Sequence, residues 1–263
     1  MTELNNSVIL ITGAAGGFGQ QLTQQLLQAG SRLILTDLNL EILQKKVAQI
    51  QQQVTTGEVI TCIASDLATP AGSQNLYEQV KALDIPVDIL INNAGLGLFG
   101  RMDEVPAEKW EQLMQVNLLA PMRLSSLFVA DMIARRQGHI VNISSLAGWI
   151  TPGGMTHYCT SKFGLRGFSK GLLNEVKAYN VKVTAVYPFF SRTPILESAS
   201  YGTLAQTKQN IPDRLISDPA KVMKNTLNAI KRDRPYVFPD PIARTIYLLQ
   251  RYFPLLYNLI TDV

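Results

Sequence analysis

A tyrosine and a lysine four residues apart carry the most explicit chemistry in this sequence. Tyr158 and Lys162 share one face of a predicted helix, because residues four apart lie one turn from each other. A phenol titrates near about 10, and a neighbouring ammonium group lowers that pKa by about 1–3 pH units. We therefore predict a tyrosine that exchanges a proton with an alcohol or carbonyl oxygen near neutral pH. On an arbitrary helix the same pair would more often be an ordinary surface contact.

A glycine-rich turn follows the first apolar run of the chain, Val8–Ile11. The segment Thr12–Gly19 reads TGAAGGFG and is followed by a helical pattern. A turn with few side chains lets the backbone approach a pyrophosphate, whose charge is stabilised by free amides and the dipole at the helix start. The alternative is a glycine-rich turn that binds no ligand. Gly13, Gly17 and Gly19 are not spaced as in the usual Gly-x-Gly-x-x-Gly fingerprint.

A carboxylate stands at the end of the second predicted strand. Asp37 could accept hydrogen bonds from the adenosine ribose hydroxyls, and a 2′-phosphate there would meet like charge. Neither the glycine turn nor Leu38 supplies an arginine or lysine to pair with that phosphate, so the charges favour NAD over NADP. Asp37 could instead be a solvated strand end or a helix cap.

Short apolar runs alternate with longer segments of helical periodicity throughout the chain. The sequence predicts seven strands, at Val8–Ile11, Arg32–Thr36, Val59–Ala64, Val87–Ile91, His139–Ser144, Lys182–Tyr187 and Tyr236–Phe238. It predicts helices at Gly17–Ala29, Leu40–Gln53, Pro70–Leu83, Ala107–Gln137, Met155–Tyr179 and Pro219–Lys231. This alternation is typical of an α/β fold whose parallel sheet has helices on both faces. We therefore expect a single doubly wound, Rossmann-type domain over residues 1–263, with a mobile substrate lid at 191–217.

Composition argues against several other classes of protein. The chain has 263 residues, of which 46% are hydrophobic, enough for one sizeable core. Its net charge of +4 is scattered rather than gathered into runs, which argues against a nucleic-acid partner. Cys62 and Cys159 have neither metal-ligand spacing nor the density of a disulfide framework, so we expect no metal site and a reducing compartment. Met1–Ser7 lacks the pattern of a signal peptide, which predicts a cytoplasmic protein.

The order and spacing of these motifs resemble the short-chain dehydrogenase/reductase family over about residues 7–193. The resemblance adds Asp66-Leu67 after the third strand and Asn92-Asn93-Ala94-Gly95 after the fourth. It also adds a strand order of 3-2-1-4-5-6-7. In this family a serine lies thirteen residues before the tyrosine, which selects Ser145 over Ser144 at the end of the fifth strand.

The resemblance implies four catalytic residues. Tyr158 would exchange the proton, and Ser145 would hydrogen-bond the substrate oxygen as negative charge develops. Lys162 would hold the nicotinamide ribose and stabilise the tyrosinate. Asn117, on the fourth predicted helix, would hold a water that relays protons toward Lys162. Ser145 could instead cap the strand end, and Asn117 could be a polar contact in mid-helix.

The resemblance also implies a set of cofactor-binding residues, with one departure from the family pattern. The set comprises Thr12, Gly13, Gly17, Phe18, Gly19, Asp37, Asp66, Leu67, Asn93, Ala94, Gly95, Tyr158, Lys162, Pro188 and Thr193. After the sixth strand the family usually carries Pro-Gly followed by a threonine that contacts the nicotinamide carboxamide. Here Phe189 replaces the glycine, which puts the conformation of that loop in question.

Residues expected to face the substrate are nearly all apolar, which favours a hydrophobic alcohol, ketone or aldehyde. They are Leu96, Leu98, Trp149, Met155, Phe189 and Phe190, and core or lid packing is the alternative. His139 and His157 lack a metal-ligand partner or nucleophile at meaningful spacing, so we expect both to be structural. Cys159 is expected to be a packed thiol.

The C-terminal tail, residues 240–263, has an apolar stripe. It comprises Ile242, Ile246, Leu249, Phe253, Leu256 and Ile260, with Arg244 and Arg251 on the other side. Charges and Pro254 make this segment unsuitable as a membrane span. Packing on the protein or on another subunit is favoured over a weak contact with a membrane surface.

The sequence as a whole predicts an NAD(H)-dependent oxidoreductase that moves hydride between a nicotinamide and a carbinol or carbonyl carbon, as a homodimer or homotetramer. Two alternatives stay open. The first is a catalytically silent regulator that binds a dinucleotide, and the second is a reductase at a membrane surface that acts on lipids or steroids with NADP.

Overall fold

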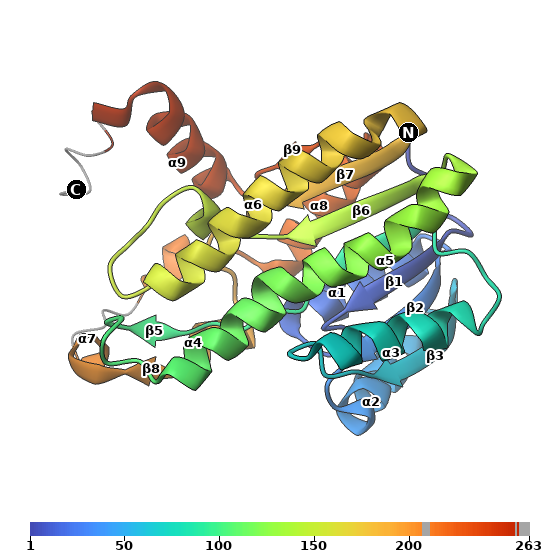
Figure 1. The fold of residues 1–263 in the computed structure, drawn as a ribbon, viewed down its shortest axis with the longest axis horizontal. Coiled ribbons are helices and arrows are strands. Elements are labelled where there is room, and N and C mark those ends of the chain that lie inside the picture. The colour runs from blue at the N-terminus through green and yellow to red at the C-terminus, as the bar shows by residue number, and fades with distance from the viewer. Residues whose placement is uncertain (207–210, 256, 258–263) are drawn as a thin grey trace.

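The computed structural model describes residues 1–206, 211–255 and 257. Seven parallel strands form one sheet in the order β3-β2-β1-β4-β6-β7-β9, which confirms the expected order (Figure 1). The strands are β1 (Val8–Thr12), β2 (Arg32–Asp37), β3 (Glu58–Ala64), β4 (Ile89–Asn92), β6 (Gly138–Ile143), β7 (Val181–Val186) and β9 (Tyr236–Val237). The chain order reverses between β1 and β4, and the carboxyl ends of these strands are where such folds bind ligands.

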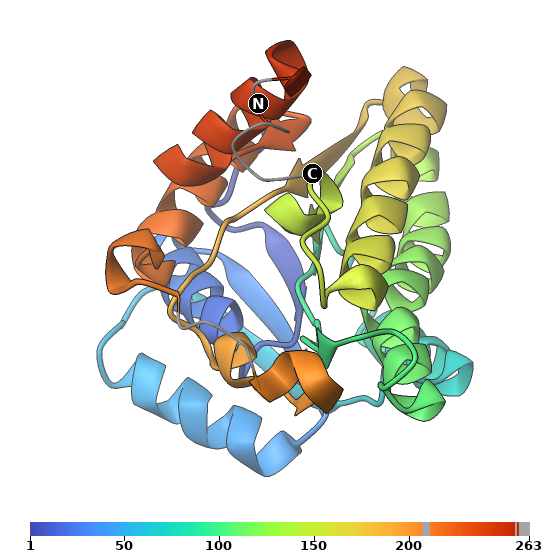
Figure 2. The same ribbon diagram turned by 90° about the vertical axis from the view of Figure 1, so that its left-hand side faces the viewer.

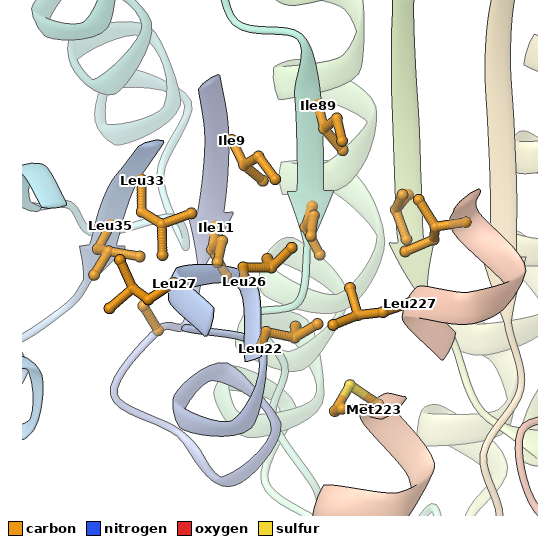
Figure 3. Close-up of a cluster of buried hydrophobic side chains, with 14 of the residues drawn as sticks. Ile9, Ile11, Leu22, Leu26, Leu27, Leu33, Leu35, Ile89, Met223 and Leu227 are labelled. Carbon is orange, nitrogen blue, oxygen red and sulfur yellow. The ribbon is translucent and has the colours of Figure 1, made fainter. Parts of the chain in front are cut away.

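Helices lie on both sides of this sheet, as Figure 2 shows. The helices are α1 (Gly17–Gln28), α2 (Leu40–Gln51), α3 (Pro70–Lys81), α4 (Ala107–Met114), α5 (Ala120–Arg135), α6 (Thr156–Val176), α7 (Gly202–Gln206), α8 (Pro219–Lys231) and α9 (Pro241–Tyr252). The alternation of side chains along a strand divides the core into two layers. Ile9 and Ile11 of β1 pack with residues of α1, α2 and α8, and this layer is drawn in Figure 3. Val8 and Leu10 pack with α3, α5 and α6 on the other face.

The long fourth helix is interrupted, contrary to the expectation of one continuous helix over Ala107–Gln137. α4 and α5 are joined by a π-helical turn, Gln115–Leu119, in which one residue more than an α-helical turn is accommodated. By length and composition alone, Ala107–Arg135 could cross a membrane. Its Leu124, Phe128 and Met132 are buried in the second core layer.

A two-stranded sheet holds the expected lid against the body. β5 (Phe99–Gly100) pairs in parallel with β8 (Ser200–Tyr201). A bridge between Ser191 and Ser217 closes the base of the lid segment. The Thr203 backbone N–H donates to Glu104 at 2.8 Å. Residues 207–210 lie outside the described part of the chain, and the mobility of the lid stays a prediction.

The described part of the C-terminal tail forms α9, which begins after the cap Asp240. Only Ala243 of this helix is buried, while Leu248, Tyr252 and Phe253 are exposed. Figure 1 shows α9 extending from the end of the molecule rather than lying on the sheet. Leu256 and Ile260 of the expected apolar stripe lie outside the described residues.

Candidate active site

The glycine turn between β1 and α1 packs directly against the loop that follows β4. Gly13 has φ +64°, and a Cβ there would lie 2.7 Å from the Ala94 Cα. The Thr12 hydroxyl accepts from the backbone N–H groups of Asn93 and Ala94, both at 3.0 Å. The Asn93 amide donates to the carbonyls of Thr12 and Gly13 at 2.9 and 3.0 Å. These hydrogen bonds therefore join the turn after β1 to the loop after β4. Only glycine fits at position 13.

The first turn of α1 is suited to an anion. No side chain caps this helix, so its first N–H groups remain available for a ligand. A Cβ at Gly17 would lie 2.6 Å from the Thr193 methyl group, and one at Gly19 would lie 2.1 Å from the Gly13 carbonyl oxygen. Phe18 packs against the first core layer. These residues fit the pyrophosphate of a dinucleotide, because the two glycines let the turn pack tightly while the first N–H groups of α1 have no side-chain cap.

The side chain of Asp37 lies beside this cradle. Its carboxylate accepts from the backbone N–H of Ala15 at 2.9 Å and from its own neighbour Leu38 at 2.8 Å. Asp37 is therefore more than a solvated strand end, because it joins β2 to the glycine turn. Asp66, after β3, is exposed and accepts from the Ala68 N–H at 3.0 Å, while Leu67 is buried in the core.

The two serines after β6 have different partners. The Ser144 hydroxyl is buried and donates to the Lys162 carbonyl at 3.2 Å, which ties β6 to α6. Ser145 hydrogen-bonds with the Tyr158 hydroxyl and also accepts from the Ala147 N–H at 3.1 Å. The geometry therefore presents Ser145, and not Ser144, beside the tyrosine.

Tyr158 and Lys162 lie on the same face of α6, as their spacing predicted. The Lys162 Nζ lies 5.7 Å from the centroid of the Tyr158 ring and donates to the Ile143 carbonyl at 3.1 Å. The lysine side chain is buried. One turn of helix and the end of β6 therefore place a phenol, a hydroxyl and an ammonium group together at the carboxyl edge of the sheet.

The predicted lowering of the tyrosine pKa is wrong for the polypeptide alone. Burial raises the pKa of Tyr158 to about 12, and the hydrogen bond with Ser145 acts in the opposite direction. Burial also lowers the pKa of Lys162 to about 8. Desolvation disfavours the charged form of each group, the tyrosinate and the ammonium. A neutral phenol able to donate a proton is therefore the resting form at pH 7.

Asn117 owes its position to the π-helical turn. Its side-chain oxygen accepts from the Leu96 N–H at 2.7 Å, and its amide donates to the Leu96 carbonyl at 2.9 Å. The amide also lies 3.3 Å from the Ser161 hydroxyl. A Cβ on Gly95 would stand 3.4 Å from the Asn117 oxygen and 3.7 Å from the Lys162 Nζ, so Gly95 leaves open the space between these two groups. π-Helical turns of this kind are frequent at functional sites.

The loop after β7 contacts two turns, the one that carries Ser145 and the glycine turn Thr12–Gly19. The Pro188 carbonyl accepts from the Leu146 N–H at 2.9 Å, and the Phe189 N–H donates to Asp240 at 2.9 Å. At the other end of the loop, Thr193 lies over Gly17. Asp240 was not among the residues singled out from the sequence, where it appears only as the start of the tail.

The apolar residues expected to face the substrate divide into two groups. Leu98 is buried in a small cluster with Val105 and Leu113, against which the Tyr158 ring packs. Leu96 is exposed, Met155 stands just before α6, and the rings of Phe189 and Phe190 lie 4.7 Å apart. The sequence missed Trp110, Met114 and Tyr201, which also pack on the Leu98 cluster.

Trp149 is a packing residue. Its ring lies 4.7 Å from that of Tyr247 and 5.8 Å from that of Tyr187, and the Arg166 guanidinium stacks at 3.3 Å from its centroid. Phe238 completes this aromatic cluster. The alternative of core packing therefore describes Trp149, and the cluster connects α6 to α9.

The remaining titratable candidates have structural surroundings. His139 lies between the hydroxyls of Thr2 and Thr184, each at 2.8 Å, and burial lowers its pKa to about 4. Burial also lowers the pKa of His157 and raises that of Cys159 to about 11. Within the described residues, no cluster of three His, Cys, Asp or Glu side chains could hold a metal ion.

Comparison with known proteins gives a consistent result. The family model described as short chain dehydrogenase matches residues 7–202. The 3-ketodihydrosphingosine reductase of Bos taurus is 33% identical over 218 residues, which cover 82% of this chain and 64% of the relative. The epidermal retinol dehydrogenase 2 of Homo sapiens is 31% identical over 253 residues, covering 94% of this chain and 78% of that protein. The chain thus spans slightly less than two thirds of the bovine reductase.

Solved structures show the same fold. A short-chain dehydrogenase from Sphingobium yanoikuyae in complex with NADPH matches with a TM-score of 0.80 and 25% identity, over 98% of this chain and 96% of the other. A short chain dehydrogenase/reductase from Burkholderia phymatum in complex with NAD matches with a TM-score of 0.82 and 24% identity, over 97% and 96%.

Proposed function

We propose that this chain, which belongs to the short chain dehydrogenase family, is an oxidoreductase that binds a nicotinamide dinucleotide and moves hydride between NAD(H) and a hydrophobic alcohol, ketone or aldehyde. One observation carries this proposal. The Tyr158 hydroxyl, hydrogen-bonded to Ser145, stands one helical turn from the buried Lys162 at the same sheet edge as the glycine cradle.

In such a reaction some site residues would bind the reactants and others would transfer the proton. When bound, the dinucleotide supplies or accepts the hydride. Tyr158 donates a proton to the carbonyl oxygen in reduction and accepts it in oxidation. Ser145 donates a hydrogen bond to the same oxygen as its negative charge grows. Lys162 stabilises the tyrosinate in the moment after the proton leaves, and its pKa of about 8 lets it pass a proton onward near neutral pH.

The proton path proposed here continues to Asn117. Asn117 is fixed by two hydrogen bonds to the Leu96 backbone, and Gly95 keeps the space toward Lys162 free of a side chain. A water in that space would connect the lysine to the π-helical turn. The rigidity of Asn117 supports this role, because a relay group has to hold one orientation.

The position of Asp37 supports NAD over NADP. Its carboxylate is held at the rim of the glycine turn by the Ala15 N–H, where a 2′-phosphate would meet negative charge. The turn carries no arginine or lysine between residues 13 and 19 to compensate that charge.

The apolar surroundings of Tyr158 support a hydrophobic substrate. Leu98, Val105 and Leu113 pack beside its ring, and Tyr201 brings the lid segment to the same cluster. Two relatives are named for retinol and for ketodihydrosphingosine, both molecules with long apolar chains. A carboxylate or phosphate without a partner would be penalised in such surroundings.

A second proposal concerns α9 and its C-cap, whose exposed apolar residues support weak contact with an anionic lipid surface. Leu248, Tyr252 and Phe253 are exposed, and no acidic residue lies between positions 241 and 260, whereas Arg244 and Arg251 do. Leu248→Glu should reduce sedimentation with vesicles that contain phosphatidylglycerol, and vesicles of phosphatidylcholine alone should bind less. Loss of a dimer without loss of vesicle binding would assign this face to a second copy instead.

Tyr158→Phe tests the proposed reaction. Purified protein is screened with NAD and NADP against steroids, long-chain alcohols, polyols and hydroxyacyl thioesters, with NADH or NADPH formation as the signal. The variant should lose nearly all turnover and keep the dinucleotide affinity of the parent. Tyr179→Phe, at the exposed far end of the same helical segment, is the control and should keep full activity.

Two results would contradict the proposal. Undiminished turnover in Tyr158→Phe would refute the proton donor. Tight NAD binding without reduction of NAD by any substrate class would favour a regulator that only binds the dinucleotide. Cytoplasmic location and assembly as a homodimer or homotetramer stay predictions.

A further inference from the structure

A buried carboxylate joins the C-terminal helix to the loop beside the candidate site. Asp240 is 4% exposed and lies between β9 and α9. One of its oxygens accepts from the Ala243 N–H at 2.7 Å and thereby caps α9. The other accepts from the Phe189 N–H at 2.9 Å. Both donors are backbone amides, so the side chain joins two segments that are fifty-one residues apart.

The peptide group that Asp240 holds is also held from its opposite side. The Phe189 N–H and the Pro188 carbonyl belong to one trans peptide group, whose N–H and C=O point in opposite directions. The carbonyl accepts from the Leu146 N–H at 2.9 Å, and Leu146 directly follows Ser145. Asp240, the peptide group and the serine turn therefore form one continuous hydrogen-bonded chain.

The same peptide begins the loop that reaches the glycine cradle. Four residues beyond Phe189, Thr193 lies over Gly17, where a Cβ on the glycine would be 2.6 Å from the threonine methyl group. The family usually has glycine where this chain has Phe189, so the backbone freedom of that position is reduced here. The hydrogen bond from the Phe189 N–H to the buried Asp240 carboxylate fixes the orientation of this peptide group, which a glycine at position 189 would leave free to vary.

We propose that Asp240 is a positioning residue for dinucleotide binding, acting through the Pro188–Phe189 peptide on the loop to Thr193 and on the turn that carries Ser145. The inference rests on the proposed function for its consequence in catalysis. Its structural part, the orientation of the loop, is measurable without substrate. The C-terminal helix is thereby part of the structure that holds the site.

Asp240→Asn tests this role, with Asp218→Asn as a matched control. Asparagine keeps the size of the side chain but has only one acceptor oxygen for the two amides, and it has no charge. Asp218 also precedes a proline and caps a helix, α8, by accepting from the Ala220 N–H at 2.9 Å, but it is exposed. Asp240→Ser is a second variant, because serine still caps a helix but is too short to serve both amides.

Two readouts decide the result. Hydrogen exchange of the Phe189 amide should become at least about tenfold faster in Asp240→Asn and Asp240→Ser, and the Kd for NAD should rise about tenfold, as expected for one lost hydrogen bond to a charged group. Asp218→Asn should change neither. If Asp240→Asn does not fold, Asp240→Ser provides both measurements.

The outcomes separate the inference from the proposed function. Unchanged exchange and unchanged Kd in the Asp240 variants would overturn the inference, and so would equal changes in Asp218→Asn, which would indicate a general effect of removing the charge from a capping side chain. If the parent binds NAD but turns over no alcohol, the proposed reaction fails while the exchange and Kd measurements still judge Asp240.

Discussion

Lys162→Met replaces a buried ammonium group by an apolar chain of similar length, and we expect it to raise the free energy of unfolding at pH 7 while it abolishes turnover. Lys162 is 4% exposed, and burial lowers its pKa from 10.5 to about 8. A change of that size corresponds to about 3 kcal/mol, because each pH unit corresponds to about 1.4 kcal/mol. Methionine loses the hydrogen bond that the charged ammonium group donates to the Ile143 carbonyl, which contributes about 1.5–2 kcal/mol. The net stabilisation is about 1–2 kcal/mol.

The stability difference between Lys162→Met and the parent should depend on pH. Between about pH 8 and 10.5 the lysine keeps its proton in the unfolded chain but has lost it in the folded protein. The unfolded state then binds more protons, so the stability of the parent protein rises with pH over this range. The advantage of Lys162→Met is therefore complete below about pH 8 and shrinks as the pH approaches 10.5.

Urea unfolding of parent and variant at pH 7, 8, 9 and 10 measures both effects. Lys170→Met, at an exposed position of the same helix, is the control and should show no such dependence on pH. A variant that is less stable than the parent at pH 7, or a stability difference that is equal at pH 7 and 10, would show that the buried charge is not destabilising.

Three further predictions follow from the contacts of the site. Gly13→Ala should lower stability by about 1–3 kcal/mol in thermal unfolding, because its Cβ would lie 2.7 Å from the Ala94 Cα at a φ of +64°; an unchanged Tm would mean that the two loops separate easily. Ser145→Ala should reduce kcat by about 10²–10³ and lower stability by no more than the loss of its Ala147 cap, whereas Ser144→Ala should lower stability and keep kcat; the reverse pattern would exchange their roles. Asp37→Ala should raise the Kd for NAD more than that for NADP, and a parent that already binds NADP better contradicts the charge argument.

The order of the main elements and the identity of the central pair could be predicted because both depend on local spacing. Strand and helix periods repeat along the chain, and a separation of four residues places Tyr158 and Lys162 together in any α-helix. The choice between Ser144 and Ser145 needed the family spacing. The structure presents Ser145 beside the phenol because Ser144 is turned toward the Lys162 carbonyl.

Other features escaped prediction because they depend on contacts between distant segments. The strands β5 and β8 have two residues each, too few for a periodic signal. Trp149 resembles a pocket residue in the sequence, but its partners Tyr187, Phe238 and Tyr247 come from elements far along the chain. The closeness of Tyr158 and Lys162 in the sequence also could not predict the direction in which the Tyr158 pKa shifts. That direction depends on how far the phenol is removed from water in the folded protein.

The π-helical turn at Gln115–Leu119 has a consequence for how this chain tolerates change. Because the turn accommodates one residue more than an α-helical turn, deleting one of its five residues would restore regular hydrogen bonding from α4 to α5 and keep the two helices in phase. Leu113 would stay in the cluster around Tyr158, but the local backbone of Asn117 would change and its hydrogen bonds to the Leu96 backbone would be lost. The extra residue thus serves the position of Asn117 and not the packing of the helix, and we expect a one-residue deletion here to lower turnover more than stability.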